Sequence, residues 1–256
     1  MKQYTTVIAS YTFIESLRNK LIATIAIFIL ISAGAAIFAG SMAIIEADIF
    51  QISVLAFFLR TGAAILLSLM IITSINREFN DKNHEMILST SITRTSFFIG
   101  KLGGYIMLAL LFSCCASITM FIFNPVATSM LWGLALFCET VIIASTALLF
   151  AVIINNSTLS IFAAICFYML SRSISTIVEI AAHSAEKSDS LFNMFTGYFM
   201  KFIYLLLPNL DSFCQTEWLL GGNVEKQDIG SFAIQTVIYS ALLLTVALFD
   251  FNRKNI

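Results

Sequence analysis

Charged side chains are scarce in this sequence, and their scarcity excludes the ordinary soluble class of protein. Of the 256 residues, 11% are charged and 59% are hydrophobic, whereas a soluble globular chain has about 25% charged residues. A chain embedded in lipid must satisfy its own backbone hydrogen bonds, which leaves helices or a closed barrel. The apolar stretches run unbroken for about 20 residues rather than alternating over about 10, which predicts helices. We therefore predict an all-α polytopic membrane protein.

Residues for metal, disulfide and nucleophilic chemistry are also few. The chain has five cysteines and two histidines, and no spacing among them is typical of a metal site. Cys214 lies in a hydrophilic segment and is expected to be exposed. The other four cysteines are expected to be small buried side chains within apolar stretches: Cys114, Cys115, Cys138 and Cys166. The motifs Gly-x-Ser-x-Gly and His-Glu-x-x-His do not occur, so no catalytic or metal-binding residue is predicted.

A phosphate-binding loop is missing as well. Such a loop reads Gly-x-x-x-x-Gly-Lys-Ser/Thr, so that its backbone amides can cradle phosphate. The nearest match ends in Gly100–Lys101, but Thr95 occupies the position of the first glycine and Leu102 that of the hydroxyl residue. The chain is therefore expected to bind no ATP in this way, to hold no cofactor and not to be an enzyme.

Six apolar stretches are long enough to cross a bilayer as helices. They are predicted at 21–44, 52–75, 102–123, 131–154, 158–181 and 231–250. The first runs for about 24 residues, longer than the about 7–15 of a secretory-signal core, so we expect it to remain as a membrane anchor. Residues 1–256 are expected to form a single transmembrane domain.

Lysine and arginine are distributed unequally between the connections of these spans. With the N-terminus in the cytoplasm, nine fall on the cytoplasmic side and three on the outer side, as the positive-inside rule requires. The nine are Lys2, Arg18, Lys20, Arg77, Lys82, Arg94, Lys101, Arg253 and Lys254, and the three are Lys187, Lys201 and Lys226. Both termini are therefore predicted to be cytoplasmic.

The outer connection 182–230 contains one further apolar segment, Leu191–Leu207. A seventh span is the rival interpretation of this segment. The segment has only about 17 residues, carries Gly197 and Lys201, and ends at Pro208. Its large apolar residues recur at helical spacing, which favours an amphipathic helix that lies in the outer interface or re-enters the membrane.

The cytoplasmic loop predicted at Asn76–Lys101 begins with charged residues and continues with apolar residues among hydroxyl side chains. Its apolar cluster consists of Met86, Ile87, Leu88 and Ile92. Such a cluster suits short amphipathic helices that lie on the membrane face or dock on a partner. A plain solvated loop remains the alternative.

Four segments carry short motifs in a definite order. The cytoplasmic loop has an acidic start, then Ile-Leu-Ser, then arginine, then Gly-Lys, at Glu78, Glu85, Ile87, Leu88, Ser89, Ile92, Arg94, Gly100 and Lys101. Thr12–Leu21 precedes the first span, Leu207–Phe213 reads Leu-Pro-Asn-Leu-x-x-Phe, and Phe251–Lys254 is a basic ending. Together these segments resemble the type-2 ABC exporter permeases, in which Thr12–Leu21 would be an amphipathic elbow.

The resemblance implies a permease subunit of the bacterial cytoplasmic (inner) membrane that moves cargo outward. It implies two cytoplasmic ABC ATPase subunits, which would bind ATP and Mg, a second permease copy or a paralogue, and no nucleic acid. The cytoplasmic loop would dock on the ATPases through Glu78, Glu85, Ile87, Leu88, Ser89, Arg94 and Lys101. Short outer connections favour an amphiphilic cargo of unknown identity. The alternatives are a non-transporting scaffold or accessory protein and a lipid-modifying enzyme, for which no catalytic cluster is found.

Ionisable residues inside the spans form the second candidate site. Arg60 and Glu139 each lie about 13 Å below the outer edge, and Arg172 lies at a similar depth. Glu179 is seven positions beyond Arg172 and shares its face. Such charges should face protein or water rather than lipid. We expect Glu139 to pair with Arg60 or Arg172, either as part of an export path or as a structural staple.

Small residues mark two places where helices could approach closely. Gly103–Gly104 is one, near the start of the third span, and the stripe 33–40 in the first span is the other. The stripe could line a dimer seam or pack within the chain, and the sequence leaves both interpretations open.

Overall fold

Helices make up nearly all of the chain that the structure, a computed structural model, describes. Residues 2–18, 22–81, 93–154, 156–186, 203–204, 207–220 and 226–253 are described, and none of them is in a β-strand. The helices are α1 (Lys2–Ser16), α2 (Ile22–Met42), α3 (Ala47–Asn80), α5 (Arg94–Phe121), α6 (Val126–Ile153), α7 (Ser157–Glu186), the 3₁₀ turn η2 (Thr216–Trp218) and α9 (Lys226–Arg253).

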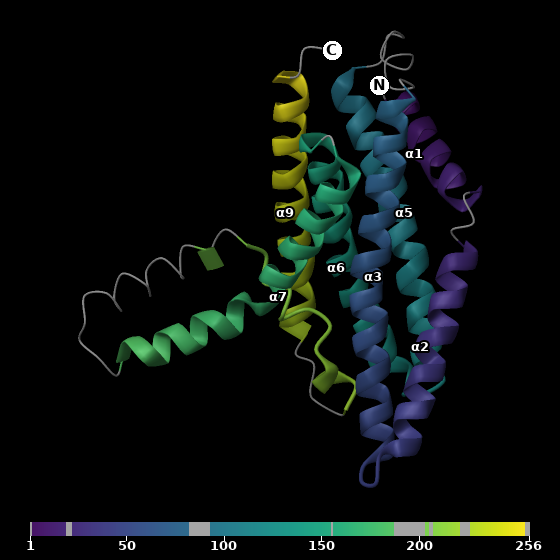
Figure 1. The fold of residues 1–256 in the computed structure, drawn as a ribbon, viewed down its shortest axis with the longest axis vertical. Coiled ribbons are helices and arrows are strands. Elements are labelled where there is room, and N and C mark those ends of the chain that lie inside the picture. The colour runs from purple at the N-terminus through teal and green to yellow at the C-terminus, as the bar shows by residue number, and fades with distance from the viewer. Residues whose placement is uncertain are drawn as a thin grey trace.

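The six predicted spans are confirmed as helices long and apolar enough to cross a membrane, namely α2, α3, α5, α6, α7 and α9. Figure 1 shows that the two chain termini lie at the same end of the bundle, which we call the terminal end. The α2–α3 turn lies at the opposite end. An even number of crossings requires the termini to share one side, so this arrangement suits a multi-pass membrane protein.

Two helices run further than predicted and shorten the loop between them. Residues 76–80 still belong to α3, and α5 begins at Arg94 rather than at 102. The predicted loop Asn76–Lys101 is therefore helical at both ends. Neither end contains a proline, and polar side chains do not stop a helix once it leaves the apolar layer. Residues 82–92 and, apart from 203–204 and 207, the predicted interfacial segment 191–207 lie outside the described residues.

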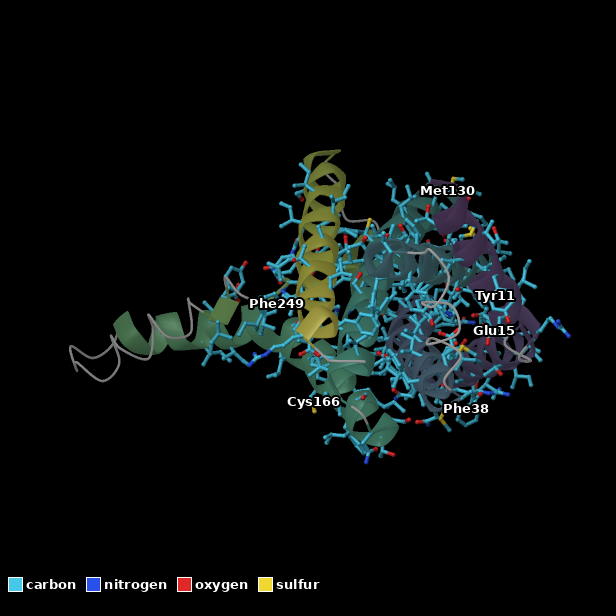
Figure 2. All side chains as sticks on the ribbon, turned by 90° about the horizontal axis from the view of Figure 1, so that it is seen from above. Tyr11, Glu15, Phe38, Met130, Cys166 and Phe249 are labelled. Carbon is cyan, nitrogen blue, oxygen red and sulfur yellow. The ribbon has the colours of Figure 1, made fainter. Side chains whose placement is uncertain are left out.

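Helix α6 occupies the centre of the bundle. It packs against α3, α5, α7 and α9, while α2 packs on α3 and α1 on α5. Most of its side chains are buried, Trp132 and Leu136 among them. On the outside of the bundle, large apolar side chains such as Phe38, Met130 and Phe249 are exposed (Figure 2). This apolar exterior suits contact with lipid rather than with water.

Helix α1 lies against α5, and two of its hydroxyl side chains face inward. Thr12 and Ser16 are buried, whereas Val7, Tyr11 and Ile14 are exposed. The contact with α5 depends on Gly100 and Gly104. A Cβ added to Gly104 would lie 2.7 Å from Thr12 Cβ and 2.9 Å from the Ala9 carbonyl oxygen. The predicted close approach at Gly103–Gly104 is therefore formed with α1.

Exchange of Gly104 for alanine is expected to push α1 away from α5, because the new methyl group would meet backbone as well as side chain. We expect a loss of about 1–3 kcal/mol in the free energy of unfolding, as for other overpacked sites. Gly34→Ala is the matched control, since a Cβ there meets no atom of the described residues within 4 Å. Alanine favours a helix over glycine, so the control should be neutral or stabilising. Equal unfolding midpoints for both variants in detergent would contradict this packing.

The small-residue stripe of α2 has no single role. A Cβ added to Gly34 would meet no described atom within 4 Å, while a Cβ on Gly40 would lie 3.1 Å from the side-chain oxygen of Gln51 in α3. Ala36 is fully buried within the chain. Part of the stripe therefore serves packing between α2 and α3.

Candidate functional site

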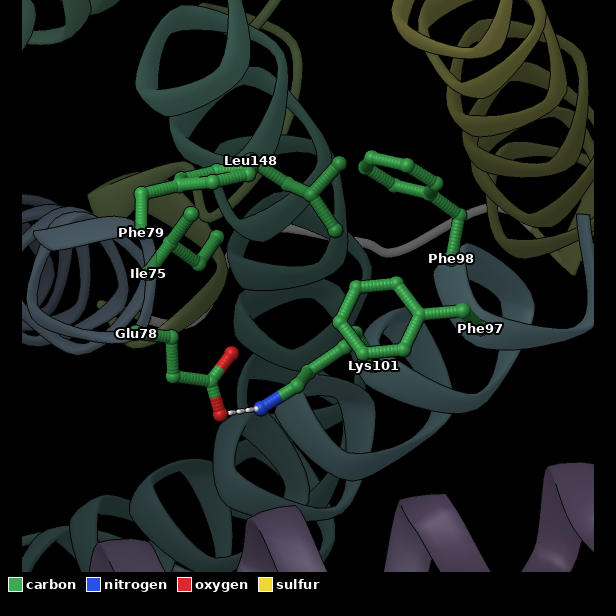
Figure 3. A pocket seen from close by; sticks show the side chains of 7 residues that line it. All are labelled: Ile75, Glu78, Phe79, Phe97, Phe98, Lys101 and Leu148. Atoms are coloured by element: carbon green, nitrogen blue, oxygen red, sulfur yellow. Dashed lines mark hydrogen bonds and ion pairs between the residues drawn. The ribbon is translucent and has the colours of Figure 1, made fainter. Parts of the chain in front are cut away.

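The first candidate site joins α3 and α5 at the terminal end of the bundle. Lys101 lies in the second turn of α5, and its Nζ donates a hydrogen bond to Oε1 of Glu78 in the last turn of α3 (Figure 3). The two side chains are only 4% and 12% exposed. The sequence singled out both residues, and the structure brings them together as a nearly buried ion pair.

An aromatic cluster covers this ion pair. Lys101 Nζ lies 5.8 Å from the centre of the Phe97 ring, within reach of a cation–π interaction. Phe251 of α9 packs edge-on to Phe98 of α5, with ring centres 4.8 Å apart, and also contacts Phe79 of α3. The remaining recess has about 10 Å³ of open volume, room for one water at most. With so little water, the attraction between Lys101 and Glu78 is only weakly screened.

Two further polar residues, Tyr105 and Glu15, are buried in part or in full between α1 and α5. Tyr105 is buried one turn beyond Lys101 on α5, and it lies within electrostatic range of Glu78 and of Glu15 from α1. The Glu15 Oε2 atom is buried and has no hydrogen-bond partner among the described residues. Tyr105 of α5 thus lies within electrostatic range of a carboxylate from α3 and of one from α1.

The helix ends on either side of 82–92 are capped. Asp81 closes α3, since its backbone N–H donates to the Arg77 carbonyl at 2.9 Å. Thr93 begins α5 as an N-cap, and its hydroxyl oxygen accepts a hydrogen bond from the Ser96 N–H. Arg94 is the first residue of α5, but its side chain is not described. The remaining predicted docking residues, Glu85, Ile87, Leu88 and Ser89, lie outside the described residues.

The second candidate site lies towards the opposite end, where the segment 207–220 inserts between the helices. Arg60 of α3 is 7% exposed. Its Nη1 donates to the Phe213 carbonyl oxygen at 3.1 Å and to that of Cys214. A guanidinium has five donors and suits a cluster of carbonyl oxygens. Arg60 therefore holds the centre of the inserted segment.

Arg172 of α7 holds the residues just before that centre. Its Nη1 donates to the Leu210 carbonyl oxygen at 3.2 Å, and its Nη2 lies 3.7 Å from Oδ1 of Asp211. Ser175 donates to the other carboxylate oxygen of Asp211 at 2.7 Å. The Leu210 N–H in turn donates to the carbonyl of Ser171 at 3.2 Å. The contact between Arg172 and Asp211 is partly exposed, whereas Arg60 is buried.

Buried aromatic side chains and two further hydrogen bonds also hold the segment 207–220 against the helices. Phe213 packs against Phe232 of α9 with ring centres 4.8 Å apart, and Trp218 packs on the same ring. Asn124 donates to the Leu219 carbonyl oxygen at 2.8 Å, and the Tyr239 hydroxyl to that of Leu207 at 3.0 Å. Contacts to α3, α7, α9 and the α5–α6 turn thus fix the segment.

Glu139 of α6 lies beneath this segment and is fully buried. Among the described residues, neither of its carboxylate oxygens has a hydrogen-bond partner. Arg60 is close enough for an electrostatic interaction, and Cys214 and Tyr168 flank the carboxylate without meeting hydrogen-bond geometry. The predicted direct bond from Arg60 or Arg172 to Glu139 is therefore not formed. Arg60 donates instead to the backbone carbonyls of Phe213 and Cys214. Arg172 donates to the Leu210 carbonyl and lies beside the Asp211 carboxylate.

Three other buried polar atoms on α6 and α7 also lack partners within the described part of the chain. They are Nε1 of Trp132, Oη of Tyr168 and Oγ of Ser171. Trp132 and Glu139 are seven residues apart on α6 and share a face, as do Tyr168 and Ser171 on α7. Glu179, by contrast, is exposed further along α7 and does not join this cluster.

Cys214 corrects the prediction of an exposed thiol. The side chain is 1% exposed, and its Sγ lies 3.7 Å from the Trp132 carbonyl oxygen. Burial raises the pKa of this thiol well above its usual value, and the neighbouring Glu139 carboxylate raises it further. The thiol therefore stays protonated and unreactive at neutral pH. Two cysteines predicted to be buried, Cys114 and Cys166, are exposed on the outside of the bundle.

Comparison with known proteins adds no assignment. No protein-family model matches the chain, and no curated protein sequence matches it. Within the described ranges, no three His, Cys, Asp or Glu side chains are grouped so that they could hold a metal ion. The two polar sites inside the bundle therefore carry the functional argument.

Proposed function

We propose that this chain is the membrane-spanning permease subunit of an ATP-driven exporter of the type-2 ABC class. The ATPase would be a separate polypeptide, present in two copies, which binds ATP and Mg and docks at the terminal end of the bundle. A second permease copy or a paralogue would complete the transport path. The cargo would be amphiphilic, and the complex would reside in the bacterial inner membrane with both termini in the cytoplasm.

The observation that carries this proposal is the buried ion pair between Glu78 and Lys101. A segment that receives force from a motor must be attached firmly to the helices that it moves. The pair fastens the end of α3 to the start of α5, at the two places where the segment 82–92 leaves and rejoins the bundle. The aromatic cluster around Phe251 extends the same rigid block to α9.

The positions of the basic residues support the orientation. Arg77, Lys101 and Arg253 belong to the terminal end, near the helix ends of α3, α5 and α9 (Figure 1). Basic residues concentrate on the cytoplasmic side of membrane proteins. The segment 82–92 would then face the compartment that holds ATP.

Affinity purification of the tagged chain from membranes of its native cells tests the proposal. An ABC ATPase, identified by peptides that include a phosphate-binding Gly-x-x-x-x-Gly-Lys-Ser/Thr loop, is expected to co-purify. Leu88→Asp should reduce its recovery about tenfold, which corresponds to about 1.4 kcal/mol of binding free energy. Leu220→Asp is the matched control, since Leu220 is exposed at the opposite end, and it should retain the ATPase.

The result also separates the proposal from its alternative. If no ATPase co-purifies, or if Leu88→Asp retains it as well as Leu220→Asp does, the segment 82–92 is not a docking site. A non-transporting scaffold of the same architecture would then account for the chain better.

A further inference from the structure

The buried cluster around Arg60 contains a guanidinium and a carboxylate that do not bond to each other. Arg60 donates to the carbonyl oxygens of Phe213 and Cys214, while both oxygens of Glu139 lack partners among the described residues. We propose that Arg60 is a latch with two alternative acceptors. It holds the two carbonyls when the segment 207–220 is inserted, and it pairs with the Glu139 carboxylate when that segment withdraws.

The energetics of the two acceptors favour such an exchange. Arg60 donates as a cation in both arrangements. A carboxylate offers it a full opposite charge and can accept through two parallel N–H groups, whereas a carbonyl oxygen offers only a dipole. A buried carboxylate without a partner is costly. The inserted state therefore leaves the strongest available pairing of Arg60 unformed. Its compensation is the burial of Phe213, Trp218 and Leu219 between the helices.

The backbone of the inserted segment adds a second reason for exchange. Cys214 has φ = 48°, in the left-handed region that side chains other than glycine rarely adopt. Such a conformation persists only where surrounding contacts impose it, and it is frequent in segments that switch. The Cys214 carbonyl is one of the two that Arg60 holds. When the latch releases, this residue can return to an ordinary conformation.

Arg172 does not act as a second latch of this kind. Its contact with Asp211 is partly exposed, with side chains 26% and 43% accessible, and exposed ion pairs contribute little. Glu139 interacts electrostatically with Arg60 rather than with Arg172. The buried exchange therefore involves Arg60 alone. Whether withdrawal of the segment opens an export path rests on the proposed function, whereas the exchange of partners does not.

Hydrogen–deuterium exchange of the purified full chain in lipid nanodiscs tests the latch without any ATPase. The readout is the exchange rate of backbone amides in peptides that cover 207–220. Glu139→Gln removes the competing charge with little change in shape, so exchange should slow at least about threefold. Arg60→Met removes the latch, so exchange should accelerate about tenfold or more. The double variant Arg60→Met, Glu139→Gln has no arginine for which position 139 could compete. Its exchange rate should therefore match that of Arg60→Met.

A purely structural role for Glu139 predicts the opposite sign. Loss of a packing partner would loosen the seat of the segment, so Glu139→Gln would speed exchange or leave it unchanged, and either outcome would overturn the latch. Peptides from the centre of α6 report whether the bundle remains folded. If Arg60→Met exposes those peptides too, the Glu139→Gln variant alone decides. A failure here would leave the ATPase co-purification unaffected, so the two proposals fail separately.

Discussion

Replacement of Lys101 with methionine is expected to destabilise the protein by roughly 3–5 kcal/mol, the usual cost of removing one partner from a buried ion pair. Glu78 would remain in a site where its side chain is 12% exposed, next to aromatic rings that exclude water. The measurement is the unfolding midpoint in detergent, together with the amount of folded protein in membranes. Arg253→Met is the control, because Arg253 is an exposed cation at the same end and surface changes rarely exceed about 0.5 kcal/mol.

The double variant Lys101→Met, Glu78→Met shows whether charge or packing causes the loss. Apolar side chains of similar volume often replace a buried pair without cost, so the double variant should recover most of the stability. If the chain is the permease proposed above, transport by the double variant should stay low, since the two helix ends would lose the directional bond between them. If the double variant is as unstable as Lys101→Met, the ion pair is not what holds α3 to α5.

The six spanning helices could be predicted because apolar length alone specifies them. The positions of their ends could not. The apolar stretches from which the spans were predicted end at 75 and begin again at 102. The helices go further, since α3 continues to Asn80 and α5 starts at Arg94. In those turns the helix is held by capping at Thr93 and by the bond between Glu78 and Lys101. Residues distant in sequence make that bond, and no local pattern encodes it.

The sequence identified the polar residues within the spans correctly, because their depth could be counted along each helix. It did not identify the groups to which they bond. Depth arguments placed Arg60, Glu139 and Arg172 near one another, and Arg60 and Glu139 do share one site. Sequence reasoning considered side chains as partners and overlooked the backbone of 207–220. Its clue was a hydrophilic segment that contains Phe213 and Trp218, both of which are buried. The same oversight made Cys214 look exposed.

Arg60→Met is expected to be the most damaging single change in the opposite half of the bundle. It removes the group that donates hydrogen bonds to the Phe213 and Cys214 carbonyls. It also removes the positive charge that lies near the Glu139 carboxylate. We expect a loss of roughly 3–5 kcal/mol, because two buried carbonyls lose their donor and a buried carboxylate loses the cation beside it. Glu139→Gln should instead be neutral or stabilising by about 1 kcal/mol, because it removes a buried charge that has no hydrogen-bond partner among the described residues. The unfolding midpoints of the unchanged chain, of Arg60→Met and of Glu139→Gln in detergent measure both effects.

The double variant Arg60→Met, Glu139→Gln separates the two losses that Arg60→Met combines. Without the carboxylate, the uncompensated charge is gone, but the two carbonyls still lack their donor, and a buried unsatisfied group costs about 1–3 kcal/mol. Recovery should therefore be partial, whereas the Lys101 and Glu78 double variant recovers nearly fully. The difference follows from the bonding: Lys101 bonds to a side chain that can be removed, and Arg60 bonds to backbone that cannot. Full recovery of the Arg60 double variant would mean that the carbonyl bonds contribute nothing.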